Sequence, residues 1–266
     1  MEHEGLTGTV QVGVVHLQRS PFERQAQTRT LVEERPLIID VRGVERFTIM
    51  RTPGMDRGLS VGFLFSEGII ESIDDIAALA ECPDDPDLIT ASLAEERATS
   101  VRHDLVVSSS GGLFGRIDTP ELVGGLGRVS GGIRVRADVL FQVSDEIPTK
   151  QALFKETGST HAAALFDRSG AIKVMCEDIG RHNAVDKVLG QALLTRMRPE
   201  DMGLSLSGRA SLELIVKAAR SKVGLVVAVG APSAQAVDAA DQLGMTLCGF
   251  VRRDEATVYT NDWRVE

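Results

Sequence analysis

Aromatic side chains are scarce in this sequence: they make up 4% of its 266 residues, with one Trp and one Tyr. Surfaces that bind single-stranded nucleic acid stack bases on aromatic rings, so a surface of that kind has little to be built from. Basic residues are also in the minority, 29 against 38 acidic ones, which gives a net charge of −9. We therefore expect neither nucleic acid nor an anionic membrane as a partner, and any anionic ligand needs a local basic cluster.

Cysteine is rare as well: the three residues Cys82, Cys176 and Cys248 are far apart and form no Cys-x-x-Cys pair. This argues against a disulfide framework and against a structural zinc site. Cys248 lies in an apolar run and is best explained as a small buried hydrophobe. Cys176 ends an apolar run beside a basic motif and is the one candidate for a reactive thiol, but structural packing is the favoured explanation.

No basic segment followed by an apolar one opens the chain, and no apolar run approaches the ~18 residues of a membrane span. We therefore expect a cytoplasmic protein. The composition, 43% hydrophobic and 25% charged, is typical of a soluble globular protein. At ~150 residues per domain, the length predicts one large domain or two small ones, and we place the boundary near residue 150.

The first half of the chain is irregular in pattern. From its periodicity we predict a loose N-terminus over 1–27, a hairpin over 36–51, a helix around Leu59–Leu64 that ends at Gly68, an acidic surface excursion over 81–99, a mobile glycine-rich segment over 111–132 and a helix over 136–147.

The second half alternates regularly between apolar runs and amphipathic segments. It predicts a hairpin over 161–176, strands over 203–207, 223–230 and 245–251, and helices over 183–194, 210–221 and 233–244. A β-α-β-α-β order implies parallel strands joined by right-handed crossovers. The fold class expected is therefore α/β.

Unusual polar residues follow the predicted strands, where ligands bind in open parallel sheets. They are Arg181, His182, Asn183 and Lys187 after one strand, Ser207, Gly208 and Arg209 after the next, and Arg252 and Arg253 after the last. Helix N-termini at this edge favour anions. An arginine at a strand end is more often a structural or solvated residue, but the convergence of several favours a phosphorylated ligand.

Two histidines, His161 and His182, lie on different predicted elements. With no third histidine or suitable cysteine nearby, a metal site is not expected. Either histidine can donate a hydrogen bond to a phosphate or a base.

Five long motifs stand out, in order from about residue 33 to 265: TPGMDRGLSVGFLFSEGII, TGSTHAAAL, EDIGRHNAVDKVLG, SGRASLELIVKA and TLCGFVRRDEATVYT. Together they resemble the FdhD family of formate dehydrogenase accessory sulfur carriers. The resemblance implies a cytidine-deaminase-like core over 151–266, with a mixed sheet covered by helices on both faces. It also implies a smaller N-terminal subdomain over 28–150. The deaminase zinc signature is absent, so deamination is not expected.

The resemblance implies an activity in sulfur handling. A carrier of this family receives sulfur from a cysteine desulfurase and passes it to the molybdenum bis(molybdopterin guanine dinucleotide) cofactor of formate dehydrogenase. The family carries a Cys-x-x-Cys on a loop, and here Gly111 and Phe114 occupy those two positions. Carried over by match, the segment that contacts the cofactor is Phe250, Val251, Arg252, Arg253, Asp254 and Glu255. The motifs around His161, Arg181 and Arg209 lie near it, and GDP is the fragment ligand expected.

These features together predict a cytoplasmic formate dehydrogenase maturation factor, a nucleotide-binding and chaperone-like protein that binds the molybdenum cofactor without forming a persulfide. The resemblance also implies a homodimer and, as partners, a cysteine desulfurase and formate dehydrogenase. One alternative is an active sulfurtransferase that uses Cys176. Another is a non-catalytic partner that pairs with, or regulates, a cysteine-bearing paralogue.

Overall fold

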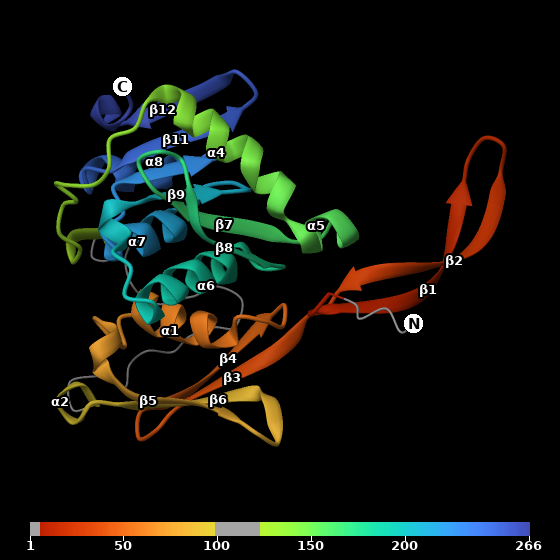
Figure 1. Cartoon of the computed structure of the whole chain (residues 1–266), viewed down its shortest axis with the longest axis horizontal. Coiled ribbons are helices and arrows are strands. Elements are labelled where there is room, and N and C mark those ends of the chain that lie inside the picture. The colour runs from red at the N-terminus through yellow and green to blue at the C-terminus, as the bar shows by residue number, and fades with distance from the viewer. Residues whose placement is uncertain (1–5, 99–122) are drawn as a thin grey trace.

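The computed structural model describes residues 6–98 and 123–266 (Figure 1). Its strands are β1 (Thr9–Gln18), β2 (Glu23–Val32), β3 (Arg35–Val41), β4 (Glu45–Arg51), β5 (Ile76–Cys82), β6 (Asp85–Leu93), β7 (His161–Phe166), β8 (Ile172–Asp178), β9 (Gly203–Leu206), β10 (Leu225–Ala228), β11 (Thr246–Arg252) and β12 (Glu255–Thr260). The α-helices are α1 (Asp56–Ser66), α2 (Glu95–Ala98), α4 (Ala137–Lys150), α5 (Ala152–Thr157), α6 (Arg181–Leu194), α7 (Leu212–Arg220) and α8 (Ala234–Gln242). Short 3₁₀ turns lie at Ile73–Asp75, Pro199–Asp201 and Asp262–Arg264.

A six-stranded mixed sheet with the order β12-β11-β10-β9-β7-β8 forms the second half of the chain. Strands β9, β10 and β11 are parallel, as the alternating pattern predicted, while β7, β8 and β12 pair antiparallel to their neighbours. Every residue of β9 and β10 is buried, because helices cover both faces of the sheet. Helix α4 packs on one face, and α6, α7 and α8 pack on the other. The predicted α/β class and the mixed sheet with helices on both faces are confirmed.

Strands β4-β3-β6-β5 form a smaller mixed sheet, and α1 packs on it (Figure 1). Helix α1 in turn lies against α6, so that the two helices separate the two sheets. The crossing of α1 and α6 depends on glycine: a Cβ on Gly62 would lie 1.8 Å from the carbonyl oxygen of Asp186, and one on Gly190 would lie 1.9 Å from that of Gly58. Any larger side chain at Gly62 or Gly190 would push the two helices apart.

The first 27 residues were expected to be loose, and this prediction is wrong for residues 9–27. Strands β1 and β2 pair antiparallel over their full lengths and form a ribbon that extends away from the rest of the molecule (Figure 1). Its base is held by Gly8, whose carbonyl accepts a hydrogen bond from Glu33 N at 2.7 Å. The apolar residues of β1 do not face a core, and Val15 and Leu17 are exposed. Without a buried face, periodicity did not indicate strands.

The acidic stretch over 81–99 is also not the surface excursion expected. Strands β5 and β6 form a hairpin there, and Ile89, Ala91 and Leu93 of β6 are buried in the core of the smaller sheet. Asp84 is exposed in the turn, whereas Asp87 of β6 pairs with the buried Arg51 at 2.9 Å. Strand β12 was not predicted. It is a short edge strand whose residues are largely exposed, so the sequence shows no buried face there.

The glycine-rich segment 111–132 is described from residue 123 onward. In that part, Val123 and Val129 pack into the core beneath α6, α7 and α8. Buried Arg264 donates hydrogen bonds to the carbonyl oxygens of Val129 at 2.9 Å and Gly131 at 2.6 Å. These contacts hold residues 129–131 in place, contrary to the mobility expected of them. Helix α4 packs on the six-stranded sheet, so the boundary predicted near residue 150 falls after an element of that sheet's core.

In residues 6–98 and 123–266, no helix is both long enough and apolar enough to cross a membrane.

Candidate functional site

The predicted site residues gather at one edge of the six-stranded sheet. Because β9, β10 and β11 are parallel, their carboxyl ends meet there; β8 ends at the same edge, and the antiparallel strand β7 begins there. This places His161 at the start of β7, the residues from Arg181 after β8, the Ser207–Arg209 loop after β9 and the 250–255 segment at the turn from β11 to β12. The topology therefore brings together four segments that are distant in sequence.

Backbone hydrogen bonds join the loops at this carboxyl edge. Ala162 N donates to Ser207 Oγ at 2.8 Å, Gly230 N to the Gly208 carbonyl at 3.0 Å, and Phe250 N to the Gly230 carbonyl at 3.2 Å. The loop after β9 also lies close to the start of β7, since a Cβ on Gly208 would lie 3.2 Å from His161 Nδ1. The loops after β9, β10 and β11 thus form one continuous backbone surface rather than three independent loops.

A cavity of about 290 Å³ lies where the N-termini of α6, α7 and α8 converge. Its walls are made by Arg181, His182, Ser211, Leu212, Glu213, Ser233 and Gln235. Ser233 caps α8 by accepting a hydrogen bond from Ala236 N at 3.2 Å, but Ser211 does not cap α7 with its side chain. The Ser211 hydroxyl is buried without a partner among the described residues. Three helix N-termini and an unpaired hydroxyl favour an anionic occupant.

His182 and Glu213 face each other in this cavity. His182 Nε2 lies 3.1 Å from Glu213 Oε2 but is not aligned for a hydrogen bond with it. Burial, with the nearby charges of Arg181 and Lys217, lowers the pKa of His182 to about 3. Burial also raises the pKa of Glu213 to about 7. The histidine is therefore neutral at physiological pH, and it offers a neutral donor or acceptor rather than a cation.

Four arginines supply positive charge at this edge of the sheet. Within residues 6–98 and 123–266, Arg181, Arg209, Arg252 and Arg253 form no ion pair. Burial and the charges of Arg181 and Arg209 lower the pKa of the half-buried His161. An edge with unpaired arginines is suited to a phosphate or pyrophosphate group, despite the acidic charge of the whole chain.

The 250–255 segment presents its side chains unevenly. Phe250 has φ of 54° and its side chain is 40% exposed, so its ring is available for stacking. Val251, by contrast, is fully buried, and its carbonyl accepts a hydrogen bond from Ser144 Oγ at 2.6 Å. The side chains of Arg252, Arg253, Asp254 and Glu255 are exposed. Val251 was predicted as a ligand contact, but its side chain belongs to the core.

Lys187 was also predicted to contact the ligand, yet its ammonium group is only 2% exposed and has three internal partners. It lies 2.8 Å from Asp178 Oδ2, 2.7 Å from the Thr52 carbonyl and 3.3 Å from the Glu177 carbonyl. Asn183 donates to Asp178 Oδ1 at 3.0 Å and to the Met50 carbonyl at 2.7 Å. Both side chains join the two halves of the chain, and their role is structural.

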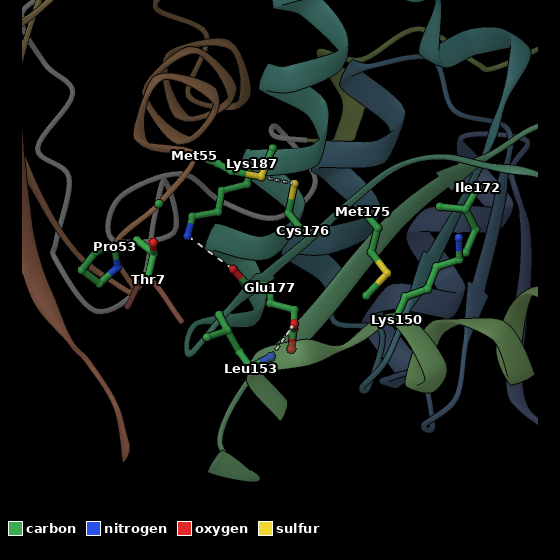
Figure 2. A pocket seen from close by; sticks show the side chains of 11 residues that line it. Thr7, Pro53, Met55, Lys150, Leu153, Ile172, Met175, Cys176, Glu177 and Lys187 are labelled. Atoms are coloured by element: carbon green, nitrogen blue, oxygen red, sulfur yellow. Dashed lines mark hydrogen bonds between the residues drawn. The ribbon is translucent and has the colours of Figure 1, made fainter. Parts of the chain in front are cut away.

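Cys176 lines a second cavity, of about 440 Å³, beside the free edge of β8 (Figure 2). The thiol is 2% exposed and lies 3.4 Å from the sulfur of Met55. Burial raises its pKa to about 12. Burial raises the pKa of Cys248 to about 12 as well. Since the thiolate is the nucleophile, neither cysteine is activated for sulfur chemistry.

Gly111 and Phe114, at the positions of the family cysteines, lie outside the described residues. No group of three or more potential metal ligands occurs in the described ranges 6–98 and 123–266.

Comparisons with known proteins agree with the motifs. A family model described as FdhD/NarQ family matches residues 32–266. The chain belongs to the FdhD/NarQ family. A sulfur carrier protein FdhD from Thermoplasma acidophilum is 36% identical over 272 residues, which cover 99% of this chain and 96% of that protein. A sulfur carrier protein FdhD from Anaeromyxobacter dehalogenans strain 2CP-C is 39% identical over 253 residues, covering 88% of each.

The fold is shared with a solved FdhD-type structure. A crystal structure of a candidate formate dehydrogenase accessory protein from Desulfotalea psychrophila superposes with a TM-score of 0.78 at 22% identity, covering 97% of this chain and 99% of that one. The match covers nearly the whole of both chains, so the two proteins share one fold, and this fold includes the small N-terminal sheet and the six-stranded sheet.

Sequence reasoning missed two residues of the carboxyl edge, Ser211 and Glu213. The signal for Ser211 was available: a serine directly before an amphipathic helix is a typical N-cap. Nothing local indicated Glu213, because its importance comes from the approach of α6 to α7.

Proposed function

We propose that this member of the FdhD/NarQ family binds the guanine-dinucleotide form of the molybdenum cofactor at the carboxyl edge of its six-stranded sheet. The observation that carries the proposal is the cavity between α6, α7 and α8, with its unpaired Ser211 hydroxyl and with Arg181, which forms no ion pair with the described residues. A pyrophosphate there receives N–H groups from helix termini and the arginine charge. Phe250, exposed on the neighbouring turn, offers a ring on which a guanine base can stack.

The role that follows is to hold the cofactor and to assist the maturation of formate dehydrogenase in the cytoplasm, as a chaperone of the cofactor and in the form of a homodimer. Sulfur would come from a cysteine desulfurase and reach the cofactor without a persulfide on this chain. Gly111 and Phe114 cannot carry sulfur. Cys176, the other candidate, is buried and its thiol is held protonated by a pKa of about 12. This observation argues against the sulfurtransferase alternative.

Binding is tested by calorimetry with GDP, which supplies the base, the ribose and the pyrophosphate of the cofactor. We expect saturable binding at low salt that weakens about tenfold or more in Arg181→Ala and in Arg252→Ala, since a charge-assisted contact contributes about 1.5–3 kcal/mol. Arg168→Ala, which removes an exposed arginine elsewhere, is the matched control. Absence of binding by both GDP and the intact cofactor would reject the proposal.

Sulfur loading is tested by mass spectrometry of the intact protein after incubation with a desulfurase, cysteine and reductant. We expect no added sulfur on the folded chain. A stable gain of one sulfur that disappears in Cys176→Ala would favour the sulfurtransferase instead. Complementation of a carrier-deleted host, with and without Gly111→Cys and Phe114→Cys, then shows whether the missing thiols limit the activity in cells.

A further inference from the structure

The glycine-rich segment 125–132 lines a cavity of about 550 Å³ that the proposed function does not use. Residues from two other segments complete its walls: Arg198, Glu200 and Asp201, which precede β9, and Arg220 and Lys222, which precede β10. Arg128 lies beside Gly244, just before β11, since a Cβ there would be 3.3 Å from the Arg128 guanidinium. The cavity therefore lies at the amino edge of the parallel strands, opposite the carboxyl edge described above.

Positive charge in this cavity is only partly compensated. Arg198 pairs with Glu200 at 3.0 Å and with Asp201 at 3.3 Å. Arg128 and Lys222 form no ion pair with any residue of the ranges 6–98 and 123–266. Two exposed cations without partners thus face a cavity in a protein whose net charge is −9.

Arg220 adds a buried donor to the same wall. Its Nε is inaccessible to solvent and has no hydrogen-bond partner among the described residues. Its guanidinium packs on Gly68 and lies 5.7 Å from the centre of the Phe65 ring. Glu67 and Glu71 are near enough to act on its charge, yet neither forms an ion pair with it. A buried guanidinium nitrogen without a partner is costly, and the Arg220 side chain forms part of the cavity wall.

The glycine-rich backbone is held in a shape that leaves donors free. Arg264 binds the carbonyl oxygens of Val129 and Gly131, and Val129 N donates to the Leu243 carbonyl. The N–H groups of Gly127, Ser130 and Gly131 donate to no other residue in the described part of the chain. Backbone N–H groups on a glycine-rich turn, combined with arginine and lysine, are the donor set that recognises phosphate oxygens.

We propose that this cavity is a second anion site, which takes a phosphoryl-bearing small molecule at the amino edge of the six-stranded sheet. The free backbone donors and the charge of Arg128 come from one segment of the chain, and the charge of Lys222 and the side chain of Arg220 come from a second. Its volume of about 550 Å³ exceeds what a single phosphate needs, so the cavity has room for a further group beyond the phosphoryl. The site is independent of nucleotide binding at the carboxyl edge.

The test is a titration of the isotope-labelled full chain with pyrophosphate at low salt, followed by the amide NMR signals of Gly127, Ser130 and Gly131. We expect saturable shifts at these amides in the wild type and in Arg181→Ala, which disables only the carboxyl edge. In Arg128→Gln/Lys222→Gln the dissociation constant should rise about tenfold or more. The matched control is Arg29→Gln/Arg168→Gln, which removes two exposed charges elsewhere and should leave the affinity unchanged.

Three outcomes would overturn the second site: no shifts at the three amides, unaltered affinity in Arg128→Gln/Lys222→Gln, or an equal loss in the Arg29→Gln/Arg168→Gln control, which would indicate only a general effect of charge. Loss of the shifts in Arg181→Ala would show that the signals report the carboxyl edge, and it would also reject the inference. Because the amides are followed individually, failure here is distinct from failure of GDP binding.

Discussion

The substitution Lys217→Met tests whether a buried ion cluster holds the three helices α1, α6 and α7 together. Lys217 Nζ lies 2.9 and 2.7 Å from the two carboxylate oxygens of Asp186, and both side chains are less than 5% exposed. Ser66 Oγ of α1 donates to the same carboxylate at 2.7 Å. Burial opposes the charge on Lys217, but Asp186, Glu67 and Glu213 outweigh it and raise its pKa.

Removing the ammonium group leaves the Asp186 carboxylate buried with Ser66 as its remaining hydrogen-bond partner. Breaking one half of a buried ion pair costs about 3–5 kcal/mol, because the other charge is left without compensation. We therefore expect Lys217→Met to lower the free energy of unfolding by about 3–5 kcal/mol at pH 7.5. In the double variant Lys217→Met/Asp186→Asn the charge is gone, and much of that loss should be recovered.

Chemical denaturation followed by circular dichroism measures these differences. Lys173→Met is the control: Lys173 pairs with Asp167 at 2.7 Å on the surface, where such pairs contribute about 0–1 kcal/mol. The reasoning is refuted if Lys217→Met costs no more than Lys173→Met, or if the double variant is less stable than the single one.

Three further perturbations test other contacts. Arg264→Met should cost about 3–5 kcal/mol in chemical denaturation, because it leaves the buried carbonyl oxygens of Val129 and Gly244 without their donor; a loss below about 1 kcal/mol would contradict this. Gly62→Ala should cost about 3 kcal/mol or more by the same measurement, whereas Gly124→Ala, which meets open space, should stay within about 0.5 kcal/mol. The pKa of Glu213 is raised to about 7, so this carboxyl binds its proton more tightly in the native state than in the unfolded state. Its contribution to the free energy of unfolding is therefore most favourable below pH 4.5, and it falls by up to about 3 kcal/mol as the pH rises through 7. Glu213→Gln should therefore gain stability relative to the wild type between pH 5 and pH 8, and the opposite sign would reject the assignment.

The convergence of the site could be predicted because it follows from topology alone. Once parallel strands were recognised from β-α-β-α-β order, the residues after each strand had to meet at one edge. The structure places Arg181, Arg209 and Arg252 at that edge, as the sequence indicated. Their role in binding the cofactor stays a prediction.

Which side chains at the edge are free could not be predicted, because burial depends on contacts between distant segments. Lys187 and Arg181 look alike in sequence, six residues apart on one helix. The Lys187 ammonium group donates a hydrogen bond to the carbonyl oxygen of Thr52, in the other half of the chain, and is therefore not free to bind a ligand. Arg181 lies at the first turn of the same helix, where no such contact is made in the described ranges.

The errors in the first half have a common physical cause. Periodicity detects an element by the contrast between a buried and an exposed face, and the β1–β2 ribbon has no buried face. In the β5–β6 hairpin, acidic residues of the turn masked the alternation of Ile89, Ala91 and Leu93. Local composition therefore pointed to a surface loop where the partner strands, distant in sequence, impose a sheet.

The glycine-rich segment shows why composition alone is a poor guide to motion. Glycines lower the cost of bending a chain, but they also let it approach other atoms closely. Here the second effect decides, since Gly132 has φ of 105° and a Cβ on it would lie 3.3 Å from Arg264 Nε. A segment pinned in this way keeps its N–H groups in fixed positions, and fixed donors bind an anion with less loss of entropy than mobile ones. The glycines of this segment predicted mobility, yet the close contacts that they allow are the physical basis for expecting a second ligand site.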